Sequence, residues 1–545
     1  MCKKNFFAAV LFCFFGLLSF CQEQENPEFP ETGVDEDLEL LLGQESSFQK
    51  FNPEIQKTLA ITGIDSQLNL NPHTSSYSFE SQVLNGLYEG LFTYNEKTLA
   101  SENALAESYY ISRNKKRWTF RIRDNAFYSN GKKITALEIK MSWLKLQKTP
   151  GAPYASLLDC IQGIKEYREG KITEEEVGIK SDGQKLTVIL KSPASHLPSL
   201  LCHHAFGAVP DEEGVYSGPF TIQEKSEDCL IMKKNERYWD RENVALPEIK
   251  IFFSTDEKEN SWAFNSGKVD WVLTAFDSSI LINKKALNLT PLFGTSYLFF
   301  TCKNPVWENV LFRQALLAAV PWDKLRWGNL IPATTFIYPL MGYPKVNGYS
   351  QTDLEEAKDL MQEARKNSGI PEDKILELKM GIADTEYAKK QAQILMDAWE
   401  SLGVKLIPFK IESSRYYADI PYLNYDIFSN SWIGDFADPL AFLELFRENS
   451  TLKQTEWKND EFEKLVAQAE ETEDFSSRYQ FLSKAEQILL DDGVVIPVSH
   501  NLSFQIINLE EIGGWHSNAL DIHPLKNLYF KEKSSAEITN VVMAE

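Results

Sequence analysis

Short strand patterns alternate with amphipathic helix patterns along most of the chain, and this alternation limits the possible folds more than any other feature of the sequence. It predicts an α/β fold, in which helices cover the faces of a sheet. The chain has 545 residues, whereas a single hydrophobic core stops growing at about 250–300 residues. We therefore expect at least two large lobes. The strand patterns lie at 58–64, 118–122, 185–191, 248–254, 405–411, 425–432 and 493–500, and the helix patterns at 80–92, 307–320, 352–365, 386–403 and 460–471.

One further helix is predicted from its start signal. Thr135 is followed three residues later by Glu138, which is the spacing of a capping box. A turn at Asn130–Gly131 separates this helix from the strand before it.

The charge balance excludes one class of partner. The formal net charge is −22 and the sequence pI is about 5.0. Such a surface repels nucleic acid, and no basic stretch studded with aromatic residues is present in the sequence. We therefore expect no nucleic-acid partner.

The N-terminus has the layout of an export signal. Lys3 and Lys4 precede an uncharged apolar run from Phe6 to Phe20, which is shorter than the ~20 residues that span a bilayer. Residues 1–20 are therefore predicted to be a signal peptide and residues 21–56, which are acidic and contain prolines, a tether with one short helix. The segment ending at Cys21 resembles the lipobox of bacterial lipoproteins, although Phe20 replaces the usual small residue.

This N-terminus predicts an exported protein of the periplasm or cell envelope. Cys21 is then the lipidated first residue of the mature chain, which is anchored to the membrane. The alternative is simple cleavage of the signal and a freely soluble protein.

Four cysteines remain beyond Cys21. They show no paired spacing of the kind that binds zinc. In an oxidising compartment they allow disulfides with three possible connectivities, and free thiols in the core are the alternative. The four are Cys160, Cys202, Cys229 and Cys302.

Ten short sequence blocks follow one another along the chain. They are Asn71–Pro72, LYEGL at 87–91, ALAES at 104–108, WTFRIRDNAFYSNGKKITALEI at 118–139, SGPFTI at 217–222, NERYWD at 235–240, NSGKVDW at 265–271, VLFRQALLAAV at 310–320, DFADP at 435–439 and IPV at 496–498. No single block is specific to one family, but the order of all ten is. By these blocks the chain resembles, between about residues 57 and 535, the peptide/nickel extracytoplasmic solute-binding family, which includes the oligopeptide-binding components of ABC importers.

The resemblance implies a periplasmic-binding-protein-like fold of the hinged type II, in which two α/β lobes joined by two crossing strands close on a ligand. It implies a monomeric receptor with no catalytic residues, cofactor or metal, whose partners are a peptide ligand and the permease of an ABC importer. Mapped onto this chain, lobe I takes 57–95, 205–290 and 500–535, a subdomain inserted in lobe I takes 96–204, and lobe II takes 291–499.

The resemblance also implies a binding site around Asp435, which stands among apolar residues in SWIGDFADP at 431–439. In peptide-binding members this aspartate pairs with the α-ammonium group of the ligand. Trp432 then forms a pocket wall, and Gly434 lies beside the anchor. The alternatives for Asp435 are a helix N-cap and a pair with an internal arginine. Asp438, just before Pro439, fits a helix cap better.

On lobe I, the loop that contains Ser76 and Ser78 corresponds to the edge that contacts the other side of the peptide backbone. The strand at 425–432 would pair with an extended peptide by β-augmentation. One position departs from the family pattern. Ser429 stands where peptide binders of known preference carry a basic residue that faces the ligand's carboxylate. The length of the ligand, and whether its carboxyl end lies at this position, therefore stay open.

Other ligands and functions were weighed against peptide import. His73 suggests nickel or haem, but a single histidine is more often structural. His203 and His204 are adjacent, and adjacent residues of a strand point in opposite directions, which makes them poor metal co-ligands. An exported hydrolase is disfavoured because the sequence has no HExxH and no GxSxG motif. An envelope peptide sensor or holdase, and a receptor for a non-peptide solute, remain alternatives.

Overall fold

The computed structural model describes residues 40–42, 51–52, 54–412 and 416–532. All of them belong to one compact unit, residues 39–545. The predicted signal peptide, Cys21 and most of the predicted tether lie outside the described residues.

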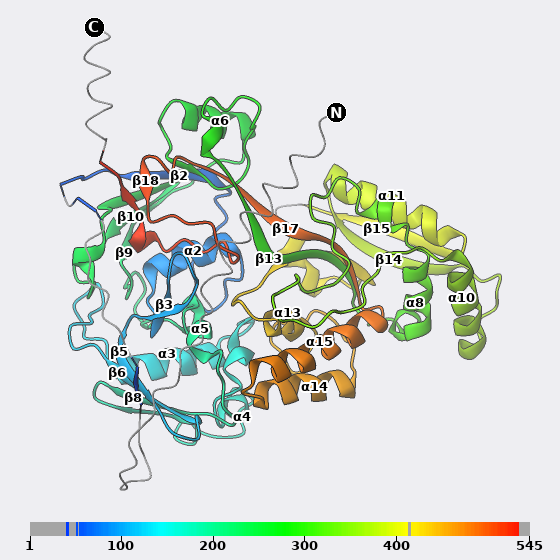
Figure 1. The fold of residues 1–545 in the computed structure, drawn as a ribbon, viewed down its shortest axis with the longest axis horizontal. Coiled ribbons are helices and arrows are strands. Elements are labelled where there is room, and N and C mark those ends of the chain that lie inside the picture. The colour runs from blue at the N-terminus through cyan, green and yellow to red at the C-terminus, as the bar shows by residue number, and fades with distance from the viewer. Residues whose placement is uncertain (1–39, 43–50, 53, 413–415, 533–545) are drawn as a thin grey trace. The chain divides into compact units, whose positions relative to one another are not determined.

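A mixed sheet of ten strands runs through this unit (Figure 1). Its order is β15-β14-β16-β13-β17-β12-β2-β11-β10-β9. The strands are β2 (Leu59–Ile64), β9 (Phe220–Lys225), β10 (Cys229–Lys234), β11 (Glu248–Phe253), β12 (Trp271–Val272), β13 (Leu287–Phe300), β14 (Leu376–Ala383), β15 (Val404–Ile411), β16 (Ile427–Ile433) and β17 (Val495–Ile507).

The two longest strands, β13 and β17, lie antiparallel to each other near the middle of this sheet. They run side by side from the β2 end of the molecule towards β14 and β15 (Figure 1). Their ladder is interrupted between Pro291 and Thr295. Pro408 lies in β15, which is an edge strand, where the missing N–H of a proline is tolerated.

A second sheet has five strands in the order β1-β5-β6-β8-β7. They are β1 (Leu40–Leu42), β5 (Ala106–Ile111), β6 (Arg117–Ile122), β7 (Ile179–Asp182) and β8 (Lys185–Ile189). Alternation of Trp118, Phe120 and Ile122 with polar residues buries these three side chains. Strand β1 stands in the segment predicted as a tether, so Leu40–Leu42 form neither tether nor helix.

Two small sheets pair β3 (Phe92–Tyr94) with β4 (Ser101–Asn103) and β18 (Ile512–Gly513) with β19 (Tyr529–Phe530).

The helices cover these sheets. The α-helices are α2 (Ser78–Leu87), α3 (Ala136–Lys148), α4 (Ile164–Arg168), α5 (Leu197–Leu200), α6 (Glu257–Asn265), α7 (Pro305–Glu308), α8 (Val310–Ala318), α9 (Trp322–Leu325), α10 (Leu354–Ser368), α11 (Glu386–Glu400), α12 (Tyr416–Asp419), α13 (Leu440–Leu443), α14 (Asp460–Glu471) and α15 (Phe475–Asp491). The 3₁₀ turns are η1 (Ala155–Leu158), η2 (His204–Phe206), η3 (Arg241–Asn243), η4 (Lys284–Ala286), η6 (Ile420–Tyr422), η7 (Glu444–Phe446) and η8 (Leu525–Asn527).

Two large apolar cores lie between these elements. One joins the side chains of the five-stranded sheet with those of β13 to β17 and their helices. The other gathers side chains of β2, β9, β10, β11 and the C-terminal segment. The predicted segment boundaries of the lobes stay a prediction, and β13 and β17 cross the boundaries drawn at 290/291 and 499/500.

Two local predictions differ from the structure. Helix α3 begins after Thr135, but the Thr135 side chain makes no capping hydrogen bond, and Glu138 forms an ion pair with Lys132 (3.1 Å) instead. The helix predicted at 307–320 is two helices, α7 and α8. Asn309 separates them, because its side chain accepts the N–H of Leu311 and caps α8.

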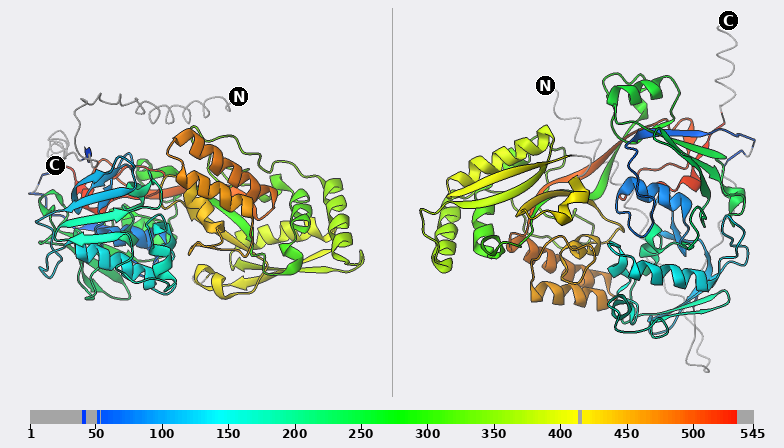
Figure 2. Two further views of the ribbon diagram at one scale, coloured as in Figure 1. Left: turned by 90° about the horizontal axis from the view of Figure 1, so that it is seen from below. Right: turned by 180° about the vertical axis from the view of Figure 1, so that it is seen from behind.

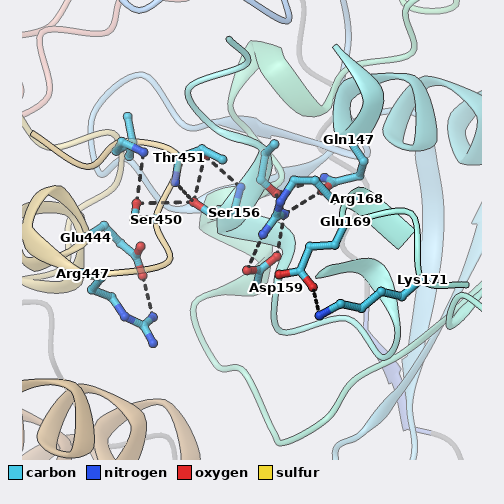
Figure 3. A network of polar contacts seen from close by, with 12 residues as sticks. Gln147, Ser156, Asp159, Arg168, Glu169, Lys171, Glu444, Arg447, Ser450 and Thr451 are labelled. Atoms are coloured by element: carbon cyan, nitrogen blue, oxygen red, sulfur yellow. Dashed lines mark hydrogen bonds and ion pairs between the residues drawn. The ribbon is translucent and has the colours of Figure 1, made fainter. Parts of the chain in front are cut away.

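The segments near α4 and near α13 meet through a set of hydroxyl contacts. Thr451 donates its N–H to the Oγ of Ser156 (3.0 Å), and the N–H of Ser156 donates to the Oγ1 of Thr451 (3.1 Å), as Figure 3 shows. Lys115 and Glu473 add an ion pair of 2.6 Å. Figure 2 shows α14 and α15, in orange, beside the cyan segment that holds α3. Chain segments about 300 residues apart are thereby held together on one side of the 431–439 turn.

Candidate functional site

A cleft of about 820 Å³ opens along β16 and β17. Strands β13, β16 and β17 form one side, and the start of α2, the segment after β12 and the segment after α9 form the others. The residues that line it are Ile64, Ser78, Phe79, Gln82, Glu257, Trp271, Leu273, Thr274, Ala275, Phe276, Leu292, Ser296, Gly328, Asn329, Leu330, Ser431, Ile433, Ser499, His500, Asn501, Leu502, Ser503, Phe504, Gln505, Asp521 and His523.

Strand β16 presents alternate residues to this cleft. Ser431 and Ile433 line it, whereas Trp432 packs against the apolar core and donates its Nε1–H to the carbonyl of Ala441 (3.0 Å). Gly434 is buried. A residue with a Cβ would not fit at this position, because that atom would lie 2.8 Å from the Phe293 ring. The residues of β16 that line the cleft are therefore Ser431 and Ile433, and not Trp432 and Gly434, which were predicted to lie at the binding site.

One edge of β16 is paired along its length and the other only at its beginning. Strand β13 pairs with every residue from Ile427 to Ile433, but β14 pairs only with Ile427 and Phe428. At Ser429 the hydroxyl of Tyr416 takes the place of a neighbouring strand and bonds the N–H (2.9 Å), the carbonyl oxygen (3.1 Å) and the Oγ (2.9 Å). Ser429 is thus held by Tyr416, and the strand edge beyond it is left without a partner strand among the described residues.

The predicted lobe I contacts lie at the start of α2. Ser78 is the first residue of this helix, and its side chain lines the cleft. Ser76 is exposed in the loop before it, and its neighbour Ser75 is buried and donates its hydroxyl to Glu80 (2.6 Å). The structure therefore brings Ser78 to the same cleft as Ser431 and Ile433.

Asp435 lies past the end of β16, and its side chain is only 11% exposed. The Tyr154 hydroxyl donates a hydrogen bond to its carboxylate. Tyr94 donates to its backbone carbonyl (3.4 Å). Its Oδ2 atom is buried and has no hydrogen-bond partner among the described residues. The carboxylate is therefore desolvated and only partly satisfied, which is costly for an ionised group.

Burial raises the pKa of Asp435 from its ordinary value to about 7, and the hydrogen bond from Tyr154 opposes this shift. His203 brings its Nε2 to 3.9 Å from the Oδ1 of Asp435, which is too long for a hydrogen bond. Burial also lowers the pKa of His203 to about 3, so this ring is neutral. Its Nδ1 accepts the N–H of Ala205 (3.3 Å), so Nε2 carries the proton.

Neither structural alternative for Asp435 is found in the described part of the chain. Helix α13 begins only at Leu440, and it is Asp438 that accepts the N–H of this residue (2.9 Å), as predicted for a cap. Arg478 pairs with Asp438 through both of its terminal nitrogens, one of them at 2.9 Å. The internal arginine therefore belongs to Asp438, and Asp435 keeps no cationic partner within the described residues.

The other candidate residues, His73, His203 and His204, are buried. His203 caps the 3₁₀ turn η2 and His204 is its first residue, so neither lies on a strand, and the expected opposite orientation is wrong. Their ring centroids are 4.1 Å apart. Both nitrogens of His204 and the Nε2 of His73 are buried without a partner in the described ranges. Burial lowers the pKa of His73 to about 4 and that of His204 well below its ordinary value. Among the described residues no three metal-ligating side chains gather into a group that would hold a metal ion.

The four cysteines are free thiols: Cys160, Cys202, Cys229 and Cys302. Over the residues that the structure describes, no helix has both the length and the apolar character needed to cross a bilayer.

Sequence reasoning missed the residues that surround Asp435. Tyr94, Tyr154 and His203 come from segments more than 200 residues away and carry no motif of their own. It also missed the cleft residues of β17 and of the segment around Asp521. Every residue of β17 from Ser499 to Gln505 lines the cleft, so the alternation of polar residues in VSHNLSFQ does not mark the lining.

Comparison with known proteins identifies the fold and the family. The family profile described as "Bacterial extracellular solute-binding proteins, family 5 Middle" matches residues 101–454. The dipeptide-binding protein DppE of Bacillus subtilis is 26% identical over 84% of this chain and 89% of its own length. The oligopeptide-binding protein OppA of the same organism is 27% identical over 81% of this chain and 87% of its own length.

Among solved structures, the murein tripeptide binding protein MppA of Escherichia coli superposes with a TM-score of 0.77 at 23% identity, over 88% of this chain and 99% of its own. The fold is therefore the α/β two-lobe fold of periplasmic binding proteins, as predicted. Members of the matching family are solute-binding proteins rather than enzymes. The chain belongs to the bacterial extracellular solute-binding proteins of family 5.

Proposed function

We propose that this protein is an extracytoplasmic receptor that binds oligopeptides in the cleft between its lobes and delivers them to an ABC importer. The observation that carries the proposal is Asp435, a buried carboxylate without a cationic partner in the described chain, at the end of a strand with an open edge. The names of the relatives, a dipeptide-binding and an oligopeptide-binding protein, support the same ligand class.

In this proposal the α-ammonium group of the peptide pairs with Asp435. It supplies the positive charge and the N–H donors that Oδ2 lacks. The peptide backbone extends along the edge of β16 at Ser431–Ile433 and contacts Ser76 and Ser78 on the other side. Such β-augmentation recognises the backbone and leaves side-chain choice broad. Trp432 and Gly434 support the strand from behind.

The cleft accommodates the side chains, and Asp435, past the end of β16, is not among the residues that line it. The cleft volume of about 820 Å³ exceeds what a dipeptide needs, and bridging water can satisfy its polar walls where a side chain is short. Ser429 is held by Tyr416 and carries no charge, so it offers no cationic partner to the carboxyl end of the ligand. We expect affinity to depend on peptide length more than on sequence.

The test combines one ligand change with one protein change. Titration calorimetry compares a polyalanine peptide that has a free amino terminus with its N-acetylated form, on the parent and on Asp435→Asn. Acetylation should weaken binding to the parent by about 2–4 kcal/mol, the scale for removing one partner of a buried charged pair. On Asp435→Asn the two peptides should bind alike.

The control is Asp211→Asn, which removes a carboxylate whose side chain is 92% exposed and lies outside the cleft. Asp211→Asn should prefer the peptide with a free amino terminus over its acetylated form as strongly as the parent does. Equal affinity of the parent for free and acetylated peptides would refute the role of Asp435. If no member of a peptide length series binds, the proposed ligand class is wrong, and native mass spectrometry of the ligand that co-purifies then shows which other solute is bound.

We also propose that Cys21 carries the lipid that anchors the mature receptor to the membrane. Two or more acyl chains give stable attachment, at about 0.8 kcal/mol per buried CH₂. Cys21→Ser should move the protein from the membrane fraction to the soluble fraction or halt its processing. The intact mass of the native protein is the direct measurement, and an unmodified N-terminus at another residue would contradict the anchor.

A further inference from the structure

The charged side chains that line the cleft are all of one sign. Glu257 and Asp521 are the two acidic residues of the lining, and it contains no lysine and no arginine among the described residues. The other titratable groups of the lining are His500 and His523. Burial lowers the pKa of His500 to about 4, which leaves that ring neutral.

Asp521 is held in place by uncharged donors. The Nε2 of Gln505 donates to both of its carboxylate oxygens (3.0 and 3.1 Å). Gln505 is itself fixed, because its Oε1 accepts the Nε1–H of Trp271 (2.8 Å), and both side chains are buried. Asp521 is 19% exposed and forms no ion pair with a lysine or arginine of the described chain. The carboxylate is thus oriented by the protein and has no lysine or arginine counter-ion in the described chain.

His523 adds an unpartnered ring nitrogen to the same wall. Its ring is 2% exposed and stacks on Trp515, with centroids 4.5 Å apart. The Nε2 of this ring lies 3.2 Å from the Oδ1 of Asp521. A carboxylate only accepts hydrogen bonds, so Nε2 of this ring carries a proton and donates it to Asp521. The Nδ1 of His523 is buried and has no partner among the described residues.

The lining carries acidic side chains and no lysine or arginine, and Asp521 has no lysine or arginine partner in the described chain. Such a wall calls for a ligand group that is positively charged and rich in N–H donors. The aromatic side chains of Phe79, Phe276 and Phe504 line the same cleft and offer apolar surface to an aliphatic stem. A lysine or arginine side chain has both parts, a charged head and a stem that packs on apolar surface.

From this arrangement we infer that Asp521 and His523 form a subsite for a basic side chain of the bound peptide. The subsite discriminates among peptides that are already bound through their backbone, so the inference rests on the proposed function. It makes the receptor selective for peptides with a lysine or arginine at one position, with Gln505 as the residue that positions Asp521.

The experiment uses polyalanine peptides of one length in which a single lysine is moved along the chain. A matched series carries norleucine, which has the stem of lysine without its ammonium group, and another carries glutamate. At one position the lysine peptide should bind the parent about tenfold or more tightly than the norleucine peptide, because the contact is charge-assisted. The glutamate peptide should bind weakest there, and added salt should reduce the preference for lysine.

Asp521→Asn should bring the lysine-to-norleucine affinity ratio at that position close to one, whereas Asp211→Asn should keep the ratio of the parent. If the lysine and norleucine peptides bind the parent with equal affinity at every position, the subsite does not exist. This result is obtained with the parent protein alone, so it does not depend on whether a variant folds. A ratio that survives in a folded Asp521→Asn variant would equally overturn it. When unsubstituted polyalanine binds but lysine gives no gain, only this inference fails. When polyalanine itself does not bind, the proposed function and the subsite fail together.

Discussion

Asp435 and Asp438 lie three residues apart in one turn, and their surroundings are opposite. Asp438 accepts the N–H of Leu440 and both terminal nitrogens of Arg478, so its charge is fully met inside the protein. Asp435 is buried to a similar extent, with side chains 11% and 12% exposed, but its Oδ2 has no partner in the described chain. Burial is therefore the same and only the presence of an internal cation differs.

This difference separates a stabilising role from a binding role. A buried carboxylate that is paired with an arginine holds the turn to α15, and its removal leaves an uncompensated guanidinium. A buried carboxylate without such a partner destabilises the folded state when it is ionised. Its position makes sense if the missing charge arrives with the ligand. The predictions below test the two halves of this comparison.

The largest effect is expected at Asp438. Asp438→Ala should lower the free energy of unfolding by about 3–5 kcal/mol, because it leaves Arg478 buried without its partner. Chemical denaturation followed by circular dichroism measures the loss. The double variant Asp438→Ala with Arg478→Leu should recover part of it, since the unpaired charge is then gone. A single variant as stable as the parent would show that the pair does not hold this turn.

Removal of the carboxylate of Asp435 should raise the free energy of unfolding, whereas removal of that of Asp438 should lower it. The pKa of Asp435 in the folded protein, about 7, lies above the ordinary value of 3.8. The fold therefore loses stability as pH rises from about 4 to about 7, and the loss is complete above pH 7. Without ligand, Asp435→Asn should be more stable than the parent by about 1–3 kcal/mol at pH 8 and equally stable at pH 4. Thermal unfolding at the two pH values measures this. A destabilised variant at pH 8 would place an undetected cation beside Asp435.

The pH dependence of binding sharpens the same point. Only the ionised carboxylate attracts an ammonium group, and burial holds the pKa of Asp435 at about 7. Affinity for a peptide with a free amino terminus should therefore rise by about tenfold per pH unit up to about pH 7, and fall again above about pH 8, where the α-ammonium group of the peptide loses its proton. The same titrations with the N-acetylated peptide, or with Asp435→Asn, should show no such slope. A slope that persists in both would have to come from another group.

The smallest effect concerns the hydrogen bond that the carboxylate of Asp435 receives from Tyr154. This bond favours the ionised carboxylate, so Tyr154→Phe should raise the pKa of Asp435 further. The midpoint of the pH–affinity curve should move up by about 0.5–1 pH unit. Tyr94→Phe is the matched control, because Tyr94 bonds the backbone carbonyl of Asp435 and not its carboxylate. Equal shifts in both variants would indicate a general change in packing.

Local pattern was enough to predict much of the fold. The alternation of Trp118, Phe120 and Ile122 marked β6, because a half-buried strand must place apolar side chains on one face. The split at Asn309 was missed, because apolar periodicity continues across a helix cap and does not reveal it. The cap at Thr135 failed for a related reason. Capping spacing is necessary for the bond, but Glu138 had a stronger partner in Lys132.

The site could be predicted only in part. Asp435 was identifiable because an acidic residue among Trp432, Ile433 and Phe436 needs a reason to be there. Tyr154, His203 and Asp521 were not identifiable, because they reach their places through contacts between distant segments. Each of them looks ordinary in its own stretch of sequence. Long-range packing decides which buried polar groups are left without partners, and no local spacing encodes it.

The two-residue strand β12 has a consequence for how the chain reaches this fold. Trp271 and Val272 pair on one side with β2, near the beginning of the chain, and on the other side with Ile506 and Ile507 of β17. The sheet at this point cannot close until the ribosome has made almost the entire chain. Contacts of such long sequence separation form slowly, because the loop must be closed before they are gained. The nascent protein should therefore stay open, and accessible to chaperones and proteases, until its last segment is available.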